Sequence, residues 1–272
     1  MPLYQQLREI LREEIVSGRL KADERVATEL ELMRRFGVSR TTVRQTIASL
    51  RKEGLLSVQR GKGTFVGAGA AARPRATSVD GFLAALASSA PLPGGGAAAA
   101  LAGALGAGLV AMVSRVTGER DGATRDEMAA ITTAADRLKD QLASLMGEDV
   151  EAYRGLLRAR KKGAGPAVIE AAMVRATEVP LGVARASGEV LGLCATAAPR
   201  ARASTLSDLG VAAALAEGAL EAAALTVRTN LRDLRDAERA RGVADELDGL
   251  TSRGSESRRR ASEVIGRRIE GA

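Results

Sequence analysis

The chain has 272 residues, enough for two domains, and contains no histidine, one cysteine, three Phe, two Tyr and no Trp. These counts exclude histidine-based acid–base or metal sites, an internal disulfide and a cysteine-cluster zinc site. The net charge of +7 is concentrated in residues 1–67, which hold 13 Lys/Arg against 8 Asp/Glu, whereas residues 68–272 hold 27 against 25. An anionic partner is therefore expected for the N-terminal part.

The first predicted elements are two helices. Apolar residues recur at helical spacing over residues 3–15, and Ser17-Gly18 ends that pattern. Thr28 suits the N-cap of a second helix, which runs to Phe36 before a tight Gly37-Val38 turn. A capping hydroxyl accepts a hydrogen bond from an unpaired N–H group of the first turn, so Thr28 marks a helix start.

A third helix and a β-hairpin follow. Ser39 suits the N-cap of the third helix, and Gly54 ends it. Residues 55–58 and 64–66 flank a turn in which Arg or Lys alternates with Gly, which predicts a small hairpin. Helix, turn, helix and β-wing together predict a winged helix-turn-helix DNA-binding domain over residues 1–67.

The third helix and the hairpin tip carry side chains suited to DNA. Arg40 and Arg44 lie one turn apart on one face, where each can bind a guanine edge or a phosphate in the major groove. The hairpin tip offers two cations on a glycine turn. The candidate DNA-binding residues are Thr28, Ser39, Arg40, Thr41, Thr42, Arg44, Arg60, Gly61 and Lys62. The alternative is that these are only exposed polar groups on a small helical domain.

Residues 3–66 resemble the N-terminal domain of GntR-family transcription regulators. The resemblance is carried by YQQL at 4–7, FGVSRTTVR at 36–44, GLL at 54–56 and GKGTFV at 61–66. It implies binding of double-stranded DNA, as a homodimer, on a roughly palindromic operator. One departure weakens the match, since Leu30 stands where the family often has an arginine that contacts phosphate.

Residues 68–77 are rich in Ala, Gly and Pro and predict a linker to a second domain over residues 78–272. Strand signals are missing from this second part, so the fold class is mainly α, with an all-α bundle after the winged helix. The expected helices lie near 79–90, 96–117, 124–161, 166–197 (bent or broken at Pro180), 207–228 and 233–268.

The stretch between Asp80 and Arg115 has no charged residue and is long enough to cross a membrane. Pro91, Pro93 and a triple glycine interrupt it, and its remainder is mostly Ala and Gly. We therefore expect a buried helix preceded by a loop, and no membrane partner. The charged, amphipathic N-terminus does not read as a secretory signal, so a cytoplasmic location is expected.

Asp149 is the first candidate functional residue of the second domain. It shares one helix face with Leu138, Leu142, Leu145, Tyr153 and Leu156. A carboxylate on an apolar stripe is costly unless it is paired, hydrogen-bonded or protonated. Burial would raise its pKa, which suits a general acid or base near neutral pH. The alternative is a carboxylate at the edge of the stripe, or one paired for structural reasons.

Three further motifs offer groups for a ligand. The segment Pro93-Gly94-Gly95-Gly96 enters a helix, and glycines with a helix N-terminus allow close approach of an anion or carbonyl. Ser207-Asp208 opens another helix and is most simply an N-cap. Arg228 and Asn230 place a cation and an amide near a helix end. Each motif alone is weak evidence.

The order and spacing of these motifs resemble the cyclodeaminase/cyclohydrolase family over residues 78–268. The matching segments are FL at 82–83, PGGG at 93–96, AGALGA at 102–107, EDVEAY at 148–153, VPL at 179–181, SDLGVA at 207–212 and NL at 230–231. The resemblance implies an all-helical dimer that acts on a tetrahydrofolate derivative without a metal or other cofactor. It also implies that Asp149 is the catalytic residue.

Several polar positions of that family are changed here. Ala97 replaces a serine, Gly147 an acidic residue and Thr226 an asparagine, and the basic residue of the segment at 116–120 is displaced. Two hypotheses stay open. The chain is a DNA-binding regulator whose helical domain binds a folate-like effector, or it is a folate enzyme, a cyclodeaminase or cyclohydrolase, with an autoregulatory DNA-binding head. A membrane-associated or scaffolding protein is the third alternative.

Overall fold

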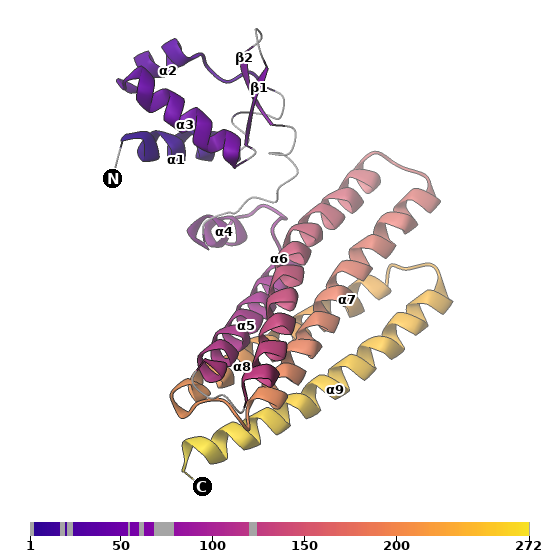
Figure 1. The fold of residues 1–272 in the computed structure, drawn as a ribbon. Coiled ribbons are helices and arrows are strands. Elements are labelled where there is room, and N and C mark those ends of the chain that lie inside the picture. The colour runs from indigo at the N-terminus through magenta and orange to yellow at the C-terminus, as the bar shows by residue number, and fades with distance from the viewer. Residues whose placement is uncertain are drawn as a thin grey trace. The chain divides into compact units, whose positions relative to one another are not determined.

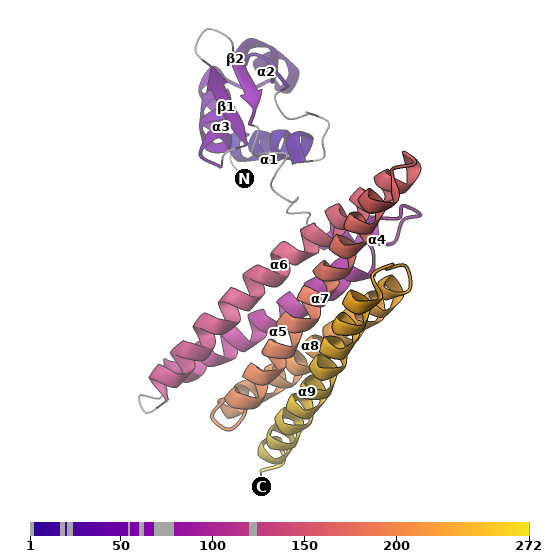
Figure 2. The same cartoon turned by 90° about the vertical axis from the view of Figure 1, so that its right-hand side faces the viewer.

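A computed structural model describes residues 3–16, 20, 24–53, 55–59, 63–67, 79–119 and 124–271. Contacts between residues divide the chain into two compact units, residues 1–81 and 82–272. Figures 1 and 2 show each unit from two sides. The predicted linker at 68–77 and the predicted helix stops at Ser17-Gly18 and Gly54 lie outside the described residues.

The first unit has the predicted winged helix-turn-helix order. Its elements are α1 (Leu3–Val16), α2 (Glu29–Phe36), α3 (Arg40–Lys52), β1 (Leu56–Gln59) and β2 (Gly63–Val66). The two strands pair antiparallel with Leu56 opposite Val66, and an isolated bridge adds Arg25 beside Phe65. Buried apolar side chains from every element form one small core, among them Leu7, Leu11, Leu32, Val43, Leu50, Leu56 and Val66.

Local sequence explains the tight turn between α2 and α3. Thr28 caps α2 in a full capping box, with Glu31 binding back to the Thr28 N–H. Gly37 ends α2 in the left-handed conformation at φ +63°, which glycine adopts without steric cost. Ser39 then caps α3 by accepting from the Thr42 N–H. The predicted caps at Thr28 and Ser39 are confirmed.

In the rest of the chain, the regular elements within the described residues are all helical. Its elements are α4 (Val79–Leu86), α5 (Gly95–Gly118), α6 (Arg125–Lys161), α7 (Pro166–Ala197), a short 3-10 turn (Ala203–Thr205), α8 (Leu206–Leu231) and α9 (Ala237–Ile269). The prediction of a helix to residue 90 is wrong, because α4 ends at Leu86 and turns lead to the prolines at 91 and 93. The mainly α fold class is confirmed.

Helices α5 to α9 form a bundle of long helices (Figures 1 and 2). Helix α5 packs on α6 and α8, and α7 packs on α6, α8 and α9. Small residues allow the close approach of α5 and α8, since a Cβ atom on Gly106 would lie 3.0 Å from the Ala212 carbonyl oxygen. Alanines therefore make much of a core that has few aromatic side chains.

Two of the described helices, α5 and α8, are long and apolar enough to cross a membrane by length and composition. Within the bundle, 61% of the most apolar window of α5 and 44% of that of α8 are buried. Both helices contribute to the central core, with Val110 and Val227 each fully buried. The prediction that the uncharged stretch contains a packed helix is confirmed.

Candidate ligand site and nucleic-acid interface

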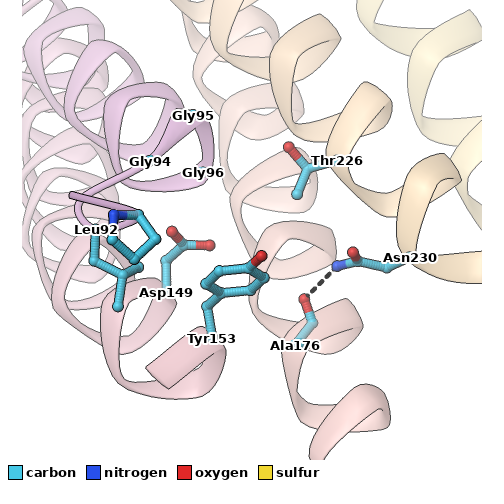
Figure 3. A pocket seen from close by; sticks show the side chains of 10 residues that line it. Leu92, Gly94, Gly95, Gly96, Asp149, Tyr153, Ala176, Thr226 and Asn230 are labelled. Carbon is cyan, nitrogen blue, oxygen red and sulfur yellow. Dashed lines mark hydrogen bonds between the residues drawn. The ribbon is translucent and has the colours of Figure 1, made fainter. Parts of the chain in front are cut away.

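A pocket lies at the end of the bundle where α5 begins and α8 ends (Figure 3). Its cavity volume is about 210 Å³. It is lined by Pro91, Leu92, Gly94, Gly95, Gly96, Asp149, Tyr153, Ala176, Thr226 and Asn230, which come from α5, α6, α7, α8 and the loop before α5. Every lining residue except Asp149 is uncharged at neutral pH. The pocket thus surrounds a single carboxyl group with neutral polar and apolar groups.

Asp149 points into this pocket from α6. Burial raises the pKa of its carboxyl group, and a hydrogen bond from the Ala97 backbone N–H opposes that shift. The N–H belongs to the first turn of α5, where helical donors lack partners inside the helix. The carboxyl group is therefore held by a helix N-terminus, while its burial raises its pKa.

The third glycine of the triple-glycine segment is what allows this arrangement. A Cβ atom on Gly96 would overlap the carboxylate of Asp149, whereas one on Gly95 would meet nothing within 4 Å. A side chain at position 96 would thus push the carboxyl group away from the Ala97 N–H. All three glycines were predicted from the sequence to contact the ligand, whereas the structure shows that Gly96 makes room for the Asp149 carboxylate.

The Tyr153 ring lies beside Asp149, and the side chains of Thr226 and Asn230 lie on the other side of the cavity (Figure 3). Tyr153 lies one helical turn after Asp149 and is 40% exposed, so its ring can contact a bound molecule. Thr226 and Asn230 are one turn apart on α8. These groups can hold a flat polar ligand against the Tyr153 ring, with its reacting atoms beside Asp149.

Asn230 is held in place by a hydrogen bond to a carbonyl group that Pro180 leaves without a partner. Because proline has no N–H group, the Ala176 carbonyl lacks its usual partner four residues on in α7. The Asn230 side chain donates to that carbonyl at 2.8 Å. The helix was expected to be bent or broken at Pro180; it is not broken there, and α7 runs from Pro166 to Ala197. The amide oxygen is then the group that Asn230 can offer to a ligand.

In the N-terminal unit, one carboxylate holds the two predicted DNA-reading arginines. Glu29 accepts from the Nε groups of Arg40 at 2.9 Å and Arg44 at 3.1 Å. The hydrogen bond from Arg40 is the main reason why the pKa of Glu29 is lowered, followed by that from Arg44. Both arginine side chains are more than 60% exposed, so they are accessible to DNA.

The hydroxyl groups around these arginines also have local roles. Thr28 and Ser39 act as helix caps, and the Ser39 hydroxyl lies 2.9 Å from that of Thr42. Thr41 is exposed on the first turn of α3. The predicted hairpin-tip residues Arg60, Gly61 and Lys62 lie outside the described residues.

Comparison with known proteins identifies both parts of the chain. Residues 78–249 match the formiminotransferase-cyclodeaminase family. The same part is 34% identical, over 198 residues, to the methenyltetrahydrofolate cyclohydrolase of Methylorubrum extorquens, a match that covers 69% of this chain and 95% of the relative. The chain belongs to the formiminotransferase-cyclodeaminase family. Residues 3–66 match the bacterial regulatory proteins of the gntR family.

Two other similar proteins each match one part of the chain. The crystal structure of formiminotetrahydrofolate cyclodeaminase from Thermotoga maritima has the same fold as the helical unit, with a TM-score of 0.67 at 24% identity over 70% of this chain and 96% of that one. The arabinose metabolism transcriptional repressor of Geobacillus stearothermophilus is 46% identical over 66 residues, and the chain spans 18% of that repressor's length. This member of the cyclodeaminase family thus carries a GntR-type head.

The pocket of this family member does not include every residue predicted for the ligand. Gly94, Gly95, Gly96, Asn230 and Asp149 meet there. The other four predicted residues lie outside the lining: Pro93, Ser207, Asp208 and Arg228. Arg228 instead pairs with Asp248 of α9 at 3.1 Å.

Ser207 and Asp208 lie at the opposite end of α8 from Thr226 and Asn230. The separation of Asp208 and Thr226 along the helix is about 27 Å. The prediction that Ser207 caps this helix is wrong, because Thr205 occupies the cap position and Ser207 lies inside the first turn.

Sequence reasoning missed part of the site. Pro91, Leu92, Ala176 and Thr226 line the pocket but were not predicted as ligand contacts, and Tyr153 was noted only as part of the apolar stripe. The spacing of four residues between Asp149 and Tyr153 was the available signal, since it places both on one helix face. Among the described residues, no cluster of three potential metal ligands occurs.

Proposed function

We propose that this protein is a one-component transcription regulator whose helical domain senses a tetrahydrofolate derivative. The observation that supports this proposal concerns the pocket. The pocket keeps Asp149 and Gly96. Two other positions, at which the family usually has a serine and an asparagine, are changed: Ala97 lies at the carboxyl group, and Thr226 lies in the lining. A pocket that keeps its shape but has altered polar groups favours ligand binding over turnover.

Asp149 suits the chemistry of the proposed ligand class. The methenyl form of tetrahydrofolate has a cationic amidinium carbon, which an ionised carboxylate attracts. The Tyr153 ring is a platform for a flat heterocycle, and cation–π attraction would add to it. No metal or other cofactor is needed for such binding.

The alternative function is a folate enzyme with an autoregulatory DNA-binding head. It is favoured by the raised pKa of Asp149, because a carboxyl group that titrates closer to neutral pH can exchange a proton with the substrate. In both the cyclodeaminase and the cyclohydrolase reaction a nucleophile, N10 or water, adds to the one-carbon unit, and a proton must move from the nucleophile to the nitrogen that leaves.

One experiment separates the two functions. The protein is titrated with DNA selected from a random pool, with and without 5,10-methenyltetrahydrofolate or 5-formiminotetrahydrofolate, while the folate absorbance is followed. For a sensor we expect about a 5- to 150-fold change in DNA affinity and no conversion of the folate, which corresponds to a typical coupling of 1–3 kcal/mol. Conversion that Asp149→Asn abolishes would establish the enzyme. Absence of any folate binding would reject both functions.

The remaining parts of the proposal are cytoplasmic location and action as a homodimer on a roughly palindromic operator. A protein that regulates transcription must reach DNA. A two-fold symmetric protein presents two identical heads to two half-sites, which explains the expected palindrome.

For the DNA interface, we expect Arg44→Ala and Arg40→Ala each to weaken binding to the selected DNA by about 5- to 150-fold, because a bidentate base contact is worth about 1–3 kcal/mol. Fluorescence anisotropy at several salt concentrations measures the effect. Arg51→Ala, at the exposed far end of α3, is the matched control and should leave affinity within about twofold. If Arg40→Ala and Arg44→Ala both bind as the parent does, α3 is not the reading helix.

Glu29 gives a second prediction for the head. The Glu29→Gln substitution removes a negative charge beside the DNA and releases the two arginines from their ion pairs. We expect tighter binding to random DNA and a smaller ratio of selected-site to random-site affinity, because phosphate attraction rises while the arginines lose their fixed position. Competition titrations with random DNA measure both. An unchanged ratio would show that Glu29 does not position the arginines.

A further inference from the structure

The segment just before α2 runs along the β-hairpin as a short third strand. The Val26 N–H donates to the Thr64 carbonyl of β2 at 2.8 Å. An isolated bridge places Arg25 opposite Phe65. Successive side chains of a strand point to opposite faces. Because Val26 is buried in the core of the head, Arg25 points away from that core, onto the outer face of the hairpin.

Gly63 leaves room for the Arg25 side chain on this outer face. Gly63 comes two residues before Phe65 in β2, so it is the diagonal neighbour of Arg25, within reach of a long side chain. A Cβ atom on Gly63 would lie 2.9 Å from the Nε atom of Arg25 and 3.5 Å from its Cζ and Nη2 atoms. The guanidinium group therefore covers the backbone at the start of β2, directly after residues 60–62 in the chain.

Arg25 is exposed and forms no ion pair within the part of the chain that the structure describes. Arg35, in contrast, pairs with Glu14. The charge of Arg25 acts on Glu31, but hydrogen bonds from Thr28 are the main reason why the pKa of Glu31 is lowered. The Glu31 carboxylate accepts from the Thr28 N–H at 2.7 Å and is thus occupied by the helix cap. The donors of Arg25 are therefore available to an external anion.

Arg25 is also close to the two arginines predicted to read DNA. It precedes Glu29 by four residues, and Glu29 accepts hydrogen bonds from both Arg40 and Arg44. Four residues span at most about 14 Å of chain, and the major groove is about 12 Å wide. A head that places Arg40 and Arg44 in the groove therefore brings Arg25 within reach of a backbone strand that borders the groove.

From this placement we infer that Arg25 is a further DNA-binding residue of the head, whose guanidinium group donates to a backbone phosphate beside the groove that α3 reads. The inference rests on the DNA binding in the proposed function, and on none of its statements about the folate. Phosphate contacts carry no sequence information, so Arg25 contributes to affinity and to the orientation of the head on the duplex. Because the guanidinium group already lies against Gly63, less conformational freedom is lost when it binds.

DNA binding of the full-length protein at several salt concentrations tests this role. Arg25→Ala should weaken binding to the selected DNA and to random DNA by the same factor, about tenfold, because it removes a hydrogen bond between charged groups. A phosphate contact also releases counterions, so the slope of log affinity against log salt concentration should become shallower by about 0.9. Arg25→Lys keeps the charge and should retain the parent's slope and most of its affinity. Fluorescence anisotropy measures both quantities.

Two further variants set the scale for Arg25→Ala. Arg51→Ala removes another exposed cation, at the far end of α3, and should leave the salt slope unchanged. Arg44→Ala should weaken binding to the selected DNA more than to random DNA, as loss of a base contact does.

Three results would overturn the inference and leave the proposed function intact. They are an unchanged salt slope for Arg25→Ala, a loss of affinity confined to the selected DNA, and an Arg25→Lys variant that binds as weakly as Arg25→Ala. The last result would show that the guanidinium group only supports the hairpin. A parent protein that binds neither DNA would reject the proposed function and this inference with it.

Discussion

Asp149→Asn is expected to lower any folate turnover by about 10²- to 10⁴-fold, the usual contribution of a general acid or base. For a sensor, it should weaken binding of 5,10-methenyltetrahydrofolate by about 10- to 150-fold, because a hydrogen bond or contact to a charged group is worth about 1.5–3 kcal/mol. Turnover falls because an amide cannot exchange the proton, and binding falls because the charge opposite the amidinium carbon is lost. Absorbance titration of purified protein measures both quantities.

The same substitution has the opposite effect on stability. Burial raises the pKa of Asp149 in the folded protein above its unfolded value, so folding favours the protonated carboxyl group. Its favourable contribution to stability is fully present below the unfolded pKa and is lost as pH rises through the folded pKa. At neutral pH, Asp149→Asn should therefore unfold at a higher temperature than the parent, and near pH 3 the difference should disappear.

These paired effects separate a functional carboxyl group from a structural one. If the carboxyl group served only folding, its replacement would lower the stability of the protein, most of all at neutral pH. Thermal unfolding between pH 3 and 8, with parent and Asp149→Asn side by side, decides the question. A lower unfolding temperature of the variant at pH 7 would contradict the functional role.

Gly96→Ala is the second change expected to have a large effect. Its new methyl group would overlap the Asp149 carboxylate, so that either α5 shifts or the carboxyl group leaves the Ala97 N–H. Overpacking at a buried site costs typically 1–3 kcal/mol. We expect a lower free energy of unfolding together with loss of folate binding comparable to that of Asp149→Asn.

Gly108→Ala is the matched control for this change. Gly108 lies in the interior of the same helix, and a Cβ atom there meets nothing within 4 Å. Alanine favours the helix over glycine by about 1 kcal/mol, so this variant should be slightly stabilised and should bind the ligand normally. Denaturant unfolding of both variants provides the measurement. Equal stability of the two variants would show that Gly96 does not support Asp149.

The double variant Gly96→Ala/Asp149→Asn extends the comparison. The two residues are in direct contact, so their effects should not be additive. Most of the loss of ligand binding caused by Gly96→Ala should already be present in Asp149→Asn. Additive losses would mean that Gly96 acts on the ligand by itself, as the sequence analysis assumed.

Much of the fold was readable from the sequence because its signals are local. Caps at Thr28 and Ser39, the turn at Gly37 and the apolar periodicity depend on residues within a few positions of one another. Asp149 was found for the same reason, since its place on an apolar stripe follows from helical spacing alone. The bounds of α7 were predicted as well, but the absence of a break at Pro180 was not, because a remote side chain binds the carbonyl that the proline leaves without a partner.

What the sequence alone determined about this protein is therefore its two-part, mainly helical plan, and it singled out the basic helix α3 and Asp149 as candidate functional sites. Only the tertiary structure decided which partner each of these residues has. It assigned Gly96 to Asp149, Asn230 to the Ala176 carbonyl and Glu29 to the two arginines. It also separated Asp208 from the pocket of its own chain. Helical periodicity specifies the face on which a residue lies, whereas contacts between helices depend on packing that brings distant segments together.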